Sequence, residues 1–134
     1  MSIIKSIMQQ LLTKSIFAGF SFLNIGSGTG YFSSLAGYVL KRGAVNHGVE
    51  VYEDLIEFAH ERLEEFLRYS PQVSREFCHP KFICGNCFCL DPSDRKYDRV
   101  YSGAACPASK VSTILQLTKI GGFAIVPCRN KVRF

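Results

Sequence analysis

The feature that most constrains this chain is a glycine-rich turn between an apolar run and a helical pattern. Residues 21–25 read as a short strand, and three glycines follow at Gly26, Gly28 and Gly30, before helical spacing resumes at Tyr31. Glycine adopts backbone angles closed to other residues and lets a ligand approach the main chain. The N-terminus of the helix that follows favours negatively charged groups. The order of strand, glycine turn and helix therefore predicts a site that cradles a phosphate or nucleotide.

The spacing of the glycines narrows the class of ligand. The pattern here is G-x-G-x-G, whereas a dinucleotide fingerprint reads G-x-G-x-x-G, so the spacing argues against a pyrophosphate clamp. Glu50 follows a second strand-like run, where an acid in an open α/β protein accepts hydrogen bonds from ribose hydroxyls. The combination favours a nucleoside-type cofactor over a glycine turn without a ligand.

Composition and charge exclude several classes of protein. The chain has 134 residues, of which 47% are hydrophobic, which is enough for one domain with one core. The formal net charge is +5, but the basic residues are scattered and form no dense patch, which argues against nucleic-acid binding. The apolar runs all fall well short of the ~20 residues of a membrane span, so no membrane association is expected.

The six cysteines indicate reduced thiols in a cytoplasmic protein, because no secretory leader is recognised. They are Cys78, Cys84, Cys87, Cys89, Cys106 and Cys128. Cys84 and Cys87 are spaced like metal ligands, but no second Cys/His pair lies at zinc-finger spacing. We therefore expect Cys84 to be a small buried apolar residue and predict no metal site.

The apolar periodicity predicts an α/β fold with a doubly wound, mostly parallel sheet. Helices are expected over 2–15, 31–42, 52–69 and 109–119, and strands over 21–25, 45–49, 81–84, 97–103 and 123–126. The chain is expected to form a single domain over 1–134, with an amphipathic helix and turn over 1–20 and a cofactor-binding core over 21–127. The fifth strand is expected to be an uncovered edge, and the isolated chain poorly soluble.

A second short motif, Gly85-Asn86-Cys87, follows the third predicted strand. Ligands of open α/β sheets lie at this end of the strands, and the Asn86 amide can both donate to and accept from an adenine edge. Without the glycine turn, an ordinary Gly-Asn turn would be the preferred interpretation.

Several collinear stretches together resemble the protein-L-isoaspartate O-methyltransferases. They are residues 22–31 (FLNIGSGTGY), 46–50 (NHGVE), 85–87 (GNC), 97–104 (YDRVYSGA) and 121–127 (GGFAIVP). The variants at Asn24 and 46–48 look most similar to the eukaryotic branch called protein-L-isoaspartate O-methyltransferase domain-containing proteins. The resemblance implies a Rossmann-like methyltransferase fold and S-adenosyl-L-methionine as the cofactor.

The resemblance also implies a reaction and a set of site residues. The reaction is methylation of the free carboxylate of isoaspartyl residues in damaged proteins. Carried over by position, Gly26, Ser27, Gly28 and Gly30 line the methionine and ribose, Glu50 holds the ribose with Val51 beside it, and Asn86 and Cys87 meet the adenine. No catalytic residue is assigned, because the attacking carboxylate is already ionised at neutral pH.

The sequence departs from the family pattern in three places. The family's Ser/Thr-containing substrate segment is not recognised ahead of Ser2, its last strands and helix are not recognised before Phe134, and Asn86 stands where the family more often has aspartate. We therefore expect a domain truncated at both ends and weak or inactive as an enzyme.

Two other functions remain open. The first is a non-catalytic, cofactor-binding adaptor, with ubiquitin-ligase components as partners of the full-length form in the domain-containing branch. The second is another Rossmann-like enzyme such as a dehydrogenase, which the glycine spacing disfavours.

Overall fold

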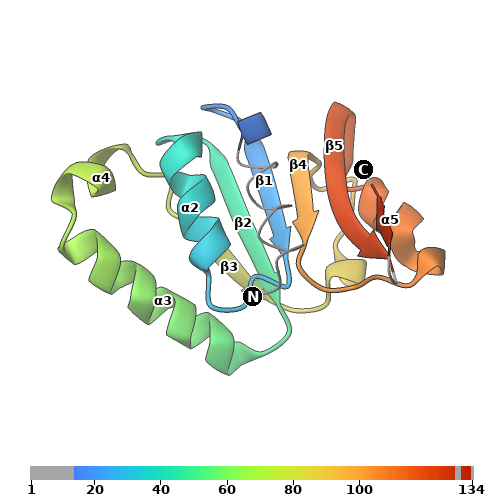
Figure 1. Ribbon diagram of the computed structural model, residues 1–134, viewed down its shortest axis with the longest axis horizontal. Helices are drawn as coiled ribbons and strands as arrows, with labels where there is room; N and C mark the ends of the chain where they lie inside the picture. The colour runs from blue at the N-terminus through green and yellow to red at the C-terminus, as the bar shows by residue number, and fades with distance from the viewer. Residues whose placement is uncertain (1–13, 129–130, 134) are drawn as a thin grey trace.

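The computed structural model describes residues 14–128 and 131–133, which form one α/β unit built on a single sheet (Figure 1). The strands are β1 (Ser21–Ile25), β2 (Val45–Glu50), β3 (Lys81–Cys84), β4 (Tyr97–Ser102), β5 (Thr118–Cys128) and β6 (Lys131–Arg133). The helices are α2 (Tyr31–Leu40), α3 (Glu53–Arg68), α4 (Pro71–Glu76) and α5 (Val111–Leu115), with 3₁₀ turns at Cys87–Cys89 and Ala108–Lys110.

The sheet has the order β3-β2-β1-β4-β5-β6. β1 to β5 are parallel, and β6 is antiparallel to β5. This is the doubly wound, mostly parallel sheet of a Rossmann-like fold, as the sequence predicted. The chain crosses over after β3, so β1 and β4 are neighbours and their carboxyl ends meet at the switch point of the sheet.

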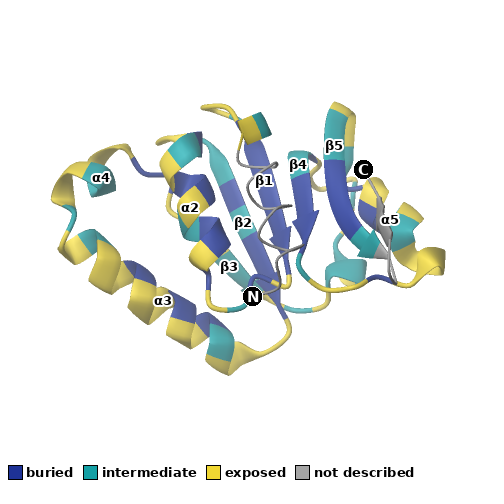
Figure 2. Ribbon diagram, in the orientation of Figure 1, coloured by how far each residue is buried: buried dark blue, intermediate teal, exposed yellow. Residues whose placement is uncertain are grey.

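Two cores form because successive strand residues point to opposite faces of the sheet. Phe22 packs on the face that α2 covers, in a cluster that includes Phe32 and Tyr101. Leu23 packs on the opposite face with Ile114 of α5. Figure 2 shows the consequence, since the central strands are buried while the outer surface of α3 is exposed.

The helix expected over 109–119 is wrong in its extent. α5 ends at Leu115, and Thr118 already belongs to β5 and pairs with Tyr97 of β4. β-branched residues are frequent in this stretch and have low helix propensity. Gly121, which follows the predicted helix, takes a φ of 85° inside β5.

The expectation of an uncovered fifth strand is wrong for the end of that strand. β5 is longer than predicted, and its end pairs with β6 from Val126 to Cys128. Val126 and Ile125 are both buried. Poor solubility of the isolated chain stays a prediction, because the pairing with β6 covers only residues 126–128 of this edge.

Smaller differences concern single residues and one loop. The predicted loop after Tyr69 contains α4, with Pro71 in its first turn, where the missing N–H is tolerated. Cys84, expected to be buried, is exposed, and so is Leu35 of α2. The helix predicted over 2–15 lies mostly outside the described residues, of which only 14–15 are helical. No helix in the described ranges is both long and apolar enough to cross a membrane.

His47 lies inside the sheet and should make the free energy of unfolding depend on pH. His47 Nδ1 of β2 lies 2.8 Å from the Tyr97 hydroxyl oxygen. Burial, assisted by nearby Arg95 and Lys81, lowers the pKa of His47 below its ordinary 6.5. The unfolded chain then binds the proton at a higher pH than the folded chain, so stability should decrease as the pH falls below about 6.5.

Urea unfolding followed from about pH 7.5 to about pH 5.5 measures this effect. His47→Gln keeps a polar side chain without the titration and should flatten the decrease in that window. An unchanged slope in the variant would assign the pH dependence to other groups.

Candidate functional site

The glycine turn lies between β1 and α2 and is tied to the end of β2. Gly26, Gly28 and Gly30 have φ values of 70°, 56° and 80°, in the left-handed region that favours glycine. The backbone N–H groups of Gly26 and Ser27 both donate to the Val49 carbonyl, at 2.8 and 3.1 Å. At these two positions the turn therefore shapes the site, and its N–H groups are already engaged within the protein.

Glu50 joins this turn to the start of the next loop. Its side chain is buried, with 7% exposed. Oε1 accepts a hydrogen bond from the Gly28 N–H at 2.9 Å. Oε2 accepts from the N–H groups of Val51 and Tyr52, at 2.9 and 3.2 Å. The carboxylate is thus fixed at the carboxyl end of β2, and lone pairs remain on both oxygens for a ligand.

A cavity of about 480 Å³ opens beside Glu50 at the carboxyl ends of β1, β2 and β4. Its volume is within the range of small-molecule sites. Five of the eight predicted site residues line it, namely Gly26, Glu50, Val51, Asn86 and Cys87. A distance of 3.7 Å separates the Ala104 Cβ from the point where a Cβ on Gly26 would lie, so a side chain there would narrow the cavity.

The other three predicted residues do not line the cavity. The Ser27 Oγ is directed toward Gly48, is buried, and has no hydrogen-bond partner among the described residues. A Cβ on Gly30 would lie 2.8 Å from the Phe82 ring and 2.9 Å from the Ala59 Cβ. Gly30 therefore allows close packing of the turn against β3 and α3. Gly28 contributes to the site indirectly, because its backbone N–H donates a hydrogen bond to the Glu50 carboxylate.

Asn86 and Cys87 form the far wall of the cavity. The Asn86 Oδ1 accepts from the Phe88 N–H at 2.9 Å and caps the 3₁₀ turn, so the side-chain oxygen is engaged locally. Burial raises the pKa of the Cys87 thiol, and the neighbouring Cys106 and Cys89 thiols raise it further. Cys87 is consequently a protonated, neutral lining residue at pH 7 and a poor nucleophile.

Several lining residues were not assigned from the sequence. They are Ile25, Val49, Tyr52, Leu55, Gly85, Phe88, Gly103 and Ala104. Most stand within two residues of a predicted site residue, and this nearness in the sequence could have been used to predict them. Gly103 and Ala104 follow β4, whose carboxyl end lies at the switch point. Within the described ranges, no three His, Cys, Asp or Glu side chains gather as metal ligands.

Solved structures share this fold. A protein-L-isoaspartate O-methyltransferase matches with a TM-score of 0.71 and 24% identity over 90% of this chain and 36% of its own. A Plasmodium falciparum protein assigned to the same class, in complex with S-adenosyl-L-homocysteine, matches with a TM-score of 0.74 and 20% identity over 96% of this chain and 60% of its own.

A third solved structure, of a protein described more broadly as a methyltransferase, shares the fold as well. The S-adenosylmethionine-dependent methyltransferase from Thiobacillus denitrificans, in complex with S-adenosyl-L-homocysteine, gives a TM-score of 0.65 and 23% identity over 93% of this chain and 48% of its own. This chain thus spans between 36% and 60% of the length of these three solved proteins.

The family is identified from the sequence itself. Residues 2–133 match the family described as protein-L-isoaspartate(D-aspartate) O-methyltransferase, a match that covers nearly the whole chain and includes the glycine turn, Glu50 and Asn86. The chain therefore belongs to the protein-L-isoaspartate(D-aspartate) O-methyltransferase family.

Proposed function

We propose that this chain binds S-adenosyl-L-methionine and serves a methyltransferase that acts on the free carboxylate of isoaspartyl residues in damaged proteins. The observation that carries the proposal is the buried Glu50 carboxylate, fixed against the glycine turn at the edge of the cavity. Structural neighbours of the same fold that hold S-adenosyl-L-homocysteine support the choice of cofactor.

The residues around the cavity fit the parts of this cofactor. Glu50 is an anionic acceptor that suits two ribose hydroxyls, and the engaged carboxylate is already held in place by three N–H groups. Asn86 and Cys87 offer a polar amide and a neutral thiol to an adenine. Gly26 and Gly28 leave room beside the backbone, Ser27 and Gly30 hold the turn in shape, and Val51 lines the ribose side.

The chemistry requires little of the protein beyond binding and orientation. S-adenosyl-L-methionine supplies an activated methyl group on a sulfonium when it is bound. The chain's residues hold the cofactor and exclude water around it, which is the contribution expected of a protein with a reactive cofactor. An isoaspartyl carboxylate has a pKa near 4 and is ionised at neutral pH, so no general base is needed.

Two assays test the proposal in sequence. Calorimetric titration with S-adenosyl-L-homocysteine measures cofactor binding. Transfer of a labelled methyl group to an isoaspartyl peptide, with the aspartyl peptide of the same sequence as control, then measures the reaction. If the chain is an enzyme, we expect it to bind S-adenosyl-L-homocysteine and to label the isoaspartyl peptide but not the aspartyl peptide. Binding without any label would favour the non-catalytic adaptor, and no binding would refute the cofactor assignment.

Asn86 provides a test of the adenine end of the cavity. Its oxygen caps the Phe88 N–H, so we expect its NH₂ group to donate to an adenine ring nitrogen. Asn86→Ala should weaken S-adenosyl-L-homocysteine binding by about fivefold, the value of one hydrogen bond of about 1 kcal/mol. Asn86→Asp keeps the capping oxygen, loses the donor and introduces the residue that the family more often has here. Weaker binding by Asn86→Asp would confirm the donor role of the amide, whereas equal or tighter binding would indicate an acceptor to the adenine amine.

The remaining parts of the proposal rest on the family resemblance. They are a role in protein repair in the cytoplasm, association of a full-length form with ubiquitin-ligase components, and one methyltransferase domain whose cofactor-binding core is 21–127. The titration with S-adenosyl-L-homocysteine does not depend on any of them.

A further inference from the structure

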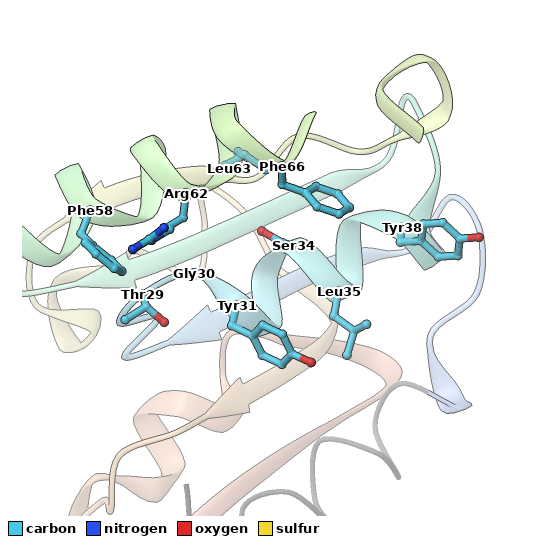
Figure 3. A pocket seen from close by; sticks show the side chains of 10 residues that line it. All are labelled: Thr29, Gly30, Tyr31, Ser34, Leu35, Tyr38, Phe58, Arg62, Leu63 and Phe66. Atoms are coloured by element: carbon cyan, nitrogen blue, oxygen red, sulfur yellow. The ribbon is translucent and has the colours of Figure 1, made fainter. Parts of the chain in front are cut away.

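A second cavity, of about 610 Å³, lies between α2 and α3 and shares no lining residue with the cavity beside Glu50. In Figure 3, Phe58, Arg62 and Phe66 point from α3 toward α2, while Tyr31, Leu35 and Tyr38 point outward from α2 at the rim of the cavity. We call it the α2–α3 groove and define it by Tyr31, Leu35 and Tyr38 of α2 and by Phe58, Arg62 and Phe66 of α3. Each set follows helical spacing, so each helix contributes one continuous row.

These rows are separate from the faces that pack on the sheet. The sheet-facing residues are buried and include Phe32, Ala36 and Leu40 of α2 and Ile56, Ala59 and Leu63 of α3. The groove residues remain in contact with solvent, with exposed fractions of 64% for Tyr31, 55% for Tyr38 and 46% for Phe66. Large apolar side chains gathered around one hollow, in contrast to scattered ones, are typical of a binding surface.

An acidic row runs beside the groove on α3. Exposed Glu57, Glu61 and Glu65 each stand one position before Phe58, Arg62 or Phe66, so the two rows are parallel along the helix. α3 carries six of the protein's 11 acidic residues, although the whole chain has a net charge of +5. Three of these six acidic residues, Glu57, Glu61 and Glu65, form the row beside the groove.

Arg62 does not cancel the acidic row. Its Nη1 lies 3.1 Å from the Glu65 carboxylate, and its guanidinium carbon lies 4.9 Å from the centre of the Phe58 ring. Its charge is paired within α3, and its long side chain adds to the floor of the groove. The balance of charge that a ligand meets here remains negative, from Glu57 and Glu61.

We propose that the α2–α3 groove binds an amphipathic helix of a partner protein, with large apolar residues on one face and lysine or arginine along the flank that meets α3. Two parallel apolar rows match the helix-in-groove mode, in which anchors recur at i, i+3, i+4 and i+7. Glu57 and Glu61, the members of the acidic row that Arg62 does not pair, complement a basic flank and set the orientation. This proposal stands apart from the methyltransferase function and does not depend on it.

The same acidic row selects against other occupants. A second copy docked groove to groove would bring two acidic α3 helices together, and like charges across an interface oppose association. A membrane surface carries anionic lipid and would be repelled in the same way. A basic helix is the occupant that both the apolar floor and the charge favour.

Two synthetic helical peptides provide the test. Both carry the same leucine and phenylalanine anchors, and they differ only in flanks of lysine or glutamate. Fluorescence anisotropy with the full chain should give at least about tenfold tighter binding of the lysine peptide at low salt, with the difference decreasing as salt is added. Equal affinity of the two peptides, or no binding of either, would overturn the proposal.

Variants then locate the site. Phe58→Ser with Phe66→Ser should weaken the lysine peptide at least about tenfold, and both positions are exposed enough for the chain to stay folded by circular dichroism. Tyr69→Ser is the matched control, because Tyr69 is 78% exposed and does not line the groove, and it should leave binding unchanged. Equal loss in the control would overturn the assignment to the groove.

Charge reversal tests the acidic row directly. The triple variant Glu57→Lys, Glu61→Lys and Glu65→Lys should prefer the glutamate peptide over the lysine peptide. An unchanged preference would overturn the proposal. The proposal would also be overturned if the chain associated with itself in sedimentation, or bound vesicles containing anionic lipid, and if that association disappeared in the variant with both Phe58→Ser and Phe66→Ser.

Discussion

Replacing Glu50 by alanine should weaken binding of S-adenosyl-L-homocysteine by about 100-fold, which corresponds to about 2.7 kcal/mol. Glu50 is the buried anion beside the cavity, and its oxygens are held by the N–H groups of Gly28, Val51 and Tyr52. A carboxylate fixed in this way is organised before the ligand arrives, so little ordering is required on binding. Calorimetric titration of wild type and variant measures the ratio.

Two controls separate ligand binding from folding. Glu53→Ala removes an exposed acid from the first turn of α3, close in sequence but away from the cavity lining, and should leave affinity unchanged. Glu50→Gln keeps the size and one acceptor oxygen, and should lie between wild type and Glu50→Ala. Urea unfolding of each variant, done at the temperature of the titration, shows whether the variant is folded under those conditions. Equal affinity of wild type and Glu50→Ala would remove the cofactor assignment.

The second large effect is expected on stability. Gly30→Ala should lower the free energy of unfolding by about 2–4 kcal/mol, from the sum of a left-handed backbone and an overpacked contact. Gly30 has a φ of 80°, and its added Cβ would lie 2.8 Å from the Phe82 ring and 2.9 Å from the Ala59 Cβ. The methyl group of Ala59 belongs to α3, which cannot move without disturbing the buried Ile56 and Leu63.

Gly28→Ala is the matched control for the backbone term. Its φ of 56° is also left-handed, but the nearest atom to an added Cβ is the Gly26 carbonyl oxygen at 3.9 Å. It should therefore cost only the backbone strain of about 1–2 kcal/mol. Urea unfolding of both variants measures the difference. Equal destabilisation would show that the third glycine is required for backbone conformation alone and not for packing against Phe82 and Ala59.

The sequence predicted the parts of the structure that depend on local pattern. The alternation of apolar periods predicted the succession of the parallel strands along the chain, and the glycine turn and Glu50 lie at the ends of β1 and β2 as expected. Because parallel strands end at the same edge of a sheet, residues 26, 50, 51, 86 and 87 were predicted to converge, and they line one cavity.

Other features could not be read from local pattern. Ser27 and Gly30 belong to the same motif as Gly26, yet their contacts are with Gly48, Phe82 and Ala59, which the sheet and α3 bring to them. The short α5 and the long β5 differ from prediction because pairing with β4 and β6 outweighs a weak helical pattern. The α2–α3 groove likewise exists only because two helices distant in sequence lie next to each other.

The amino-acid sequence by itself thus determined the fold class, the site at the switch point of the sheet and the family. Apolar periodicity, the glycine turn and a single acid are local signals. A parallel sheet brings the residues that carry them together, because its strands all end at the same edge. Tertiary structure alone decided which glycine meets the cavity and which meets a helix, where β5 ends, and that α2 and α3 leave an apolar groove. These depend on contacts between residues far apart in the chain, whose packing no local pattern specifies.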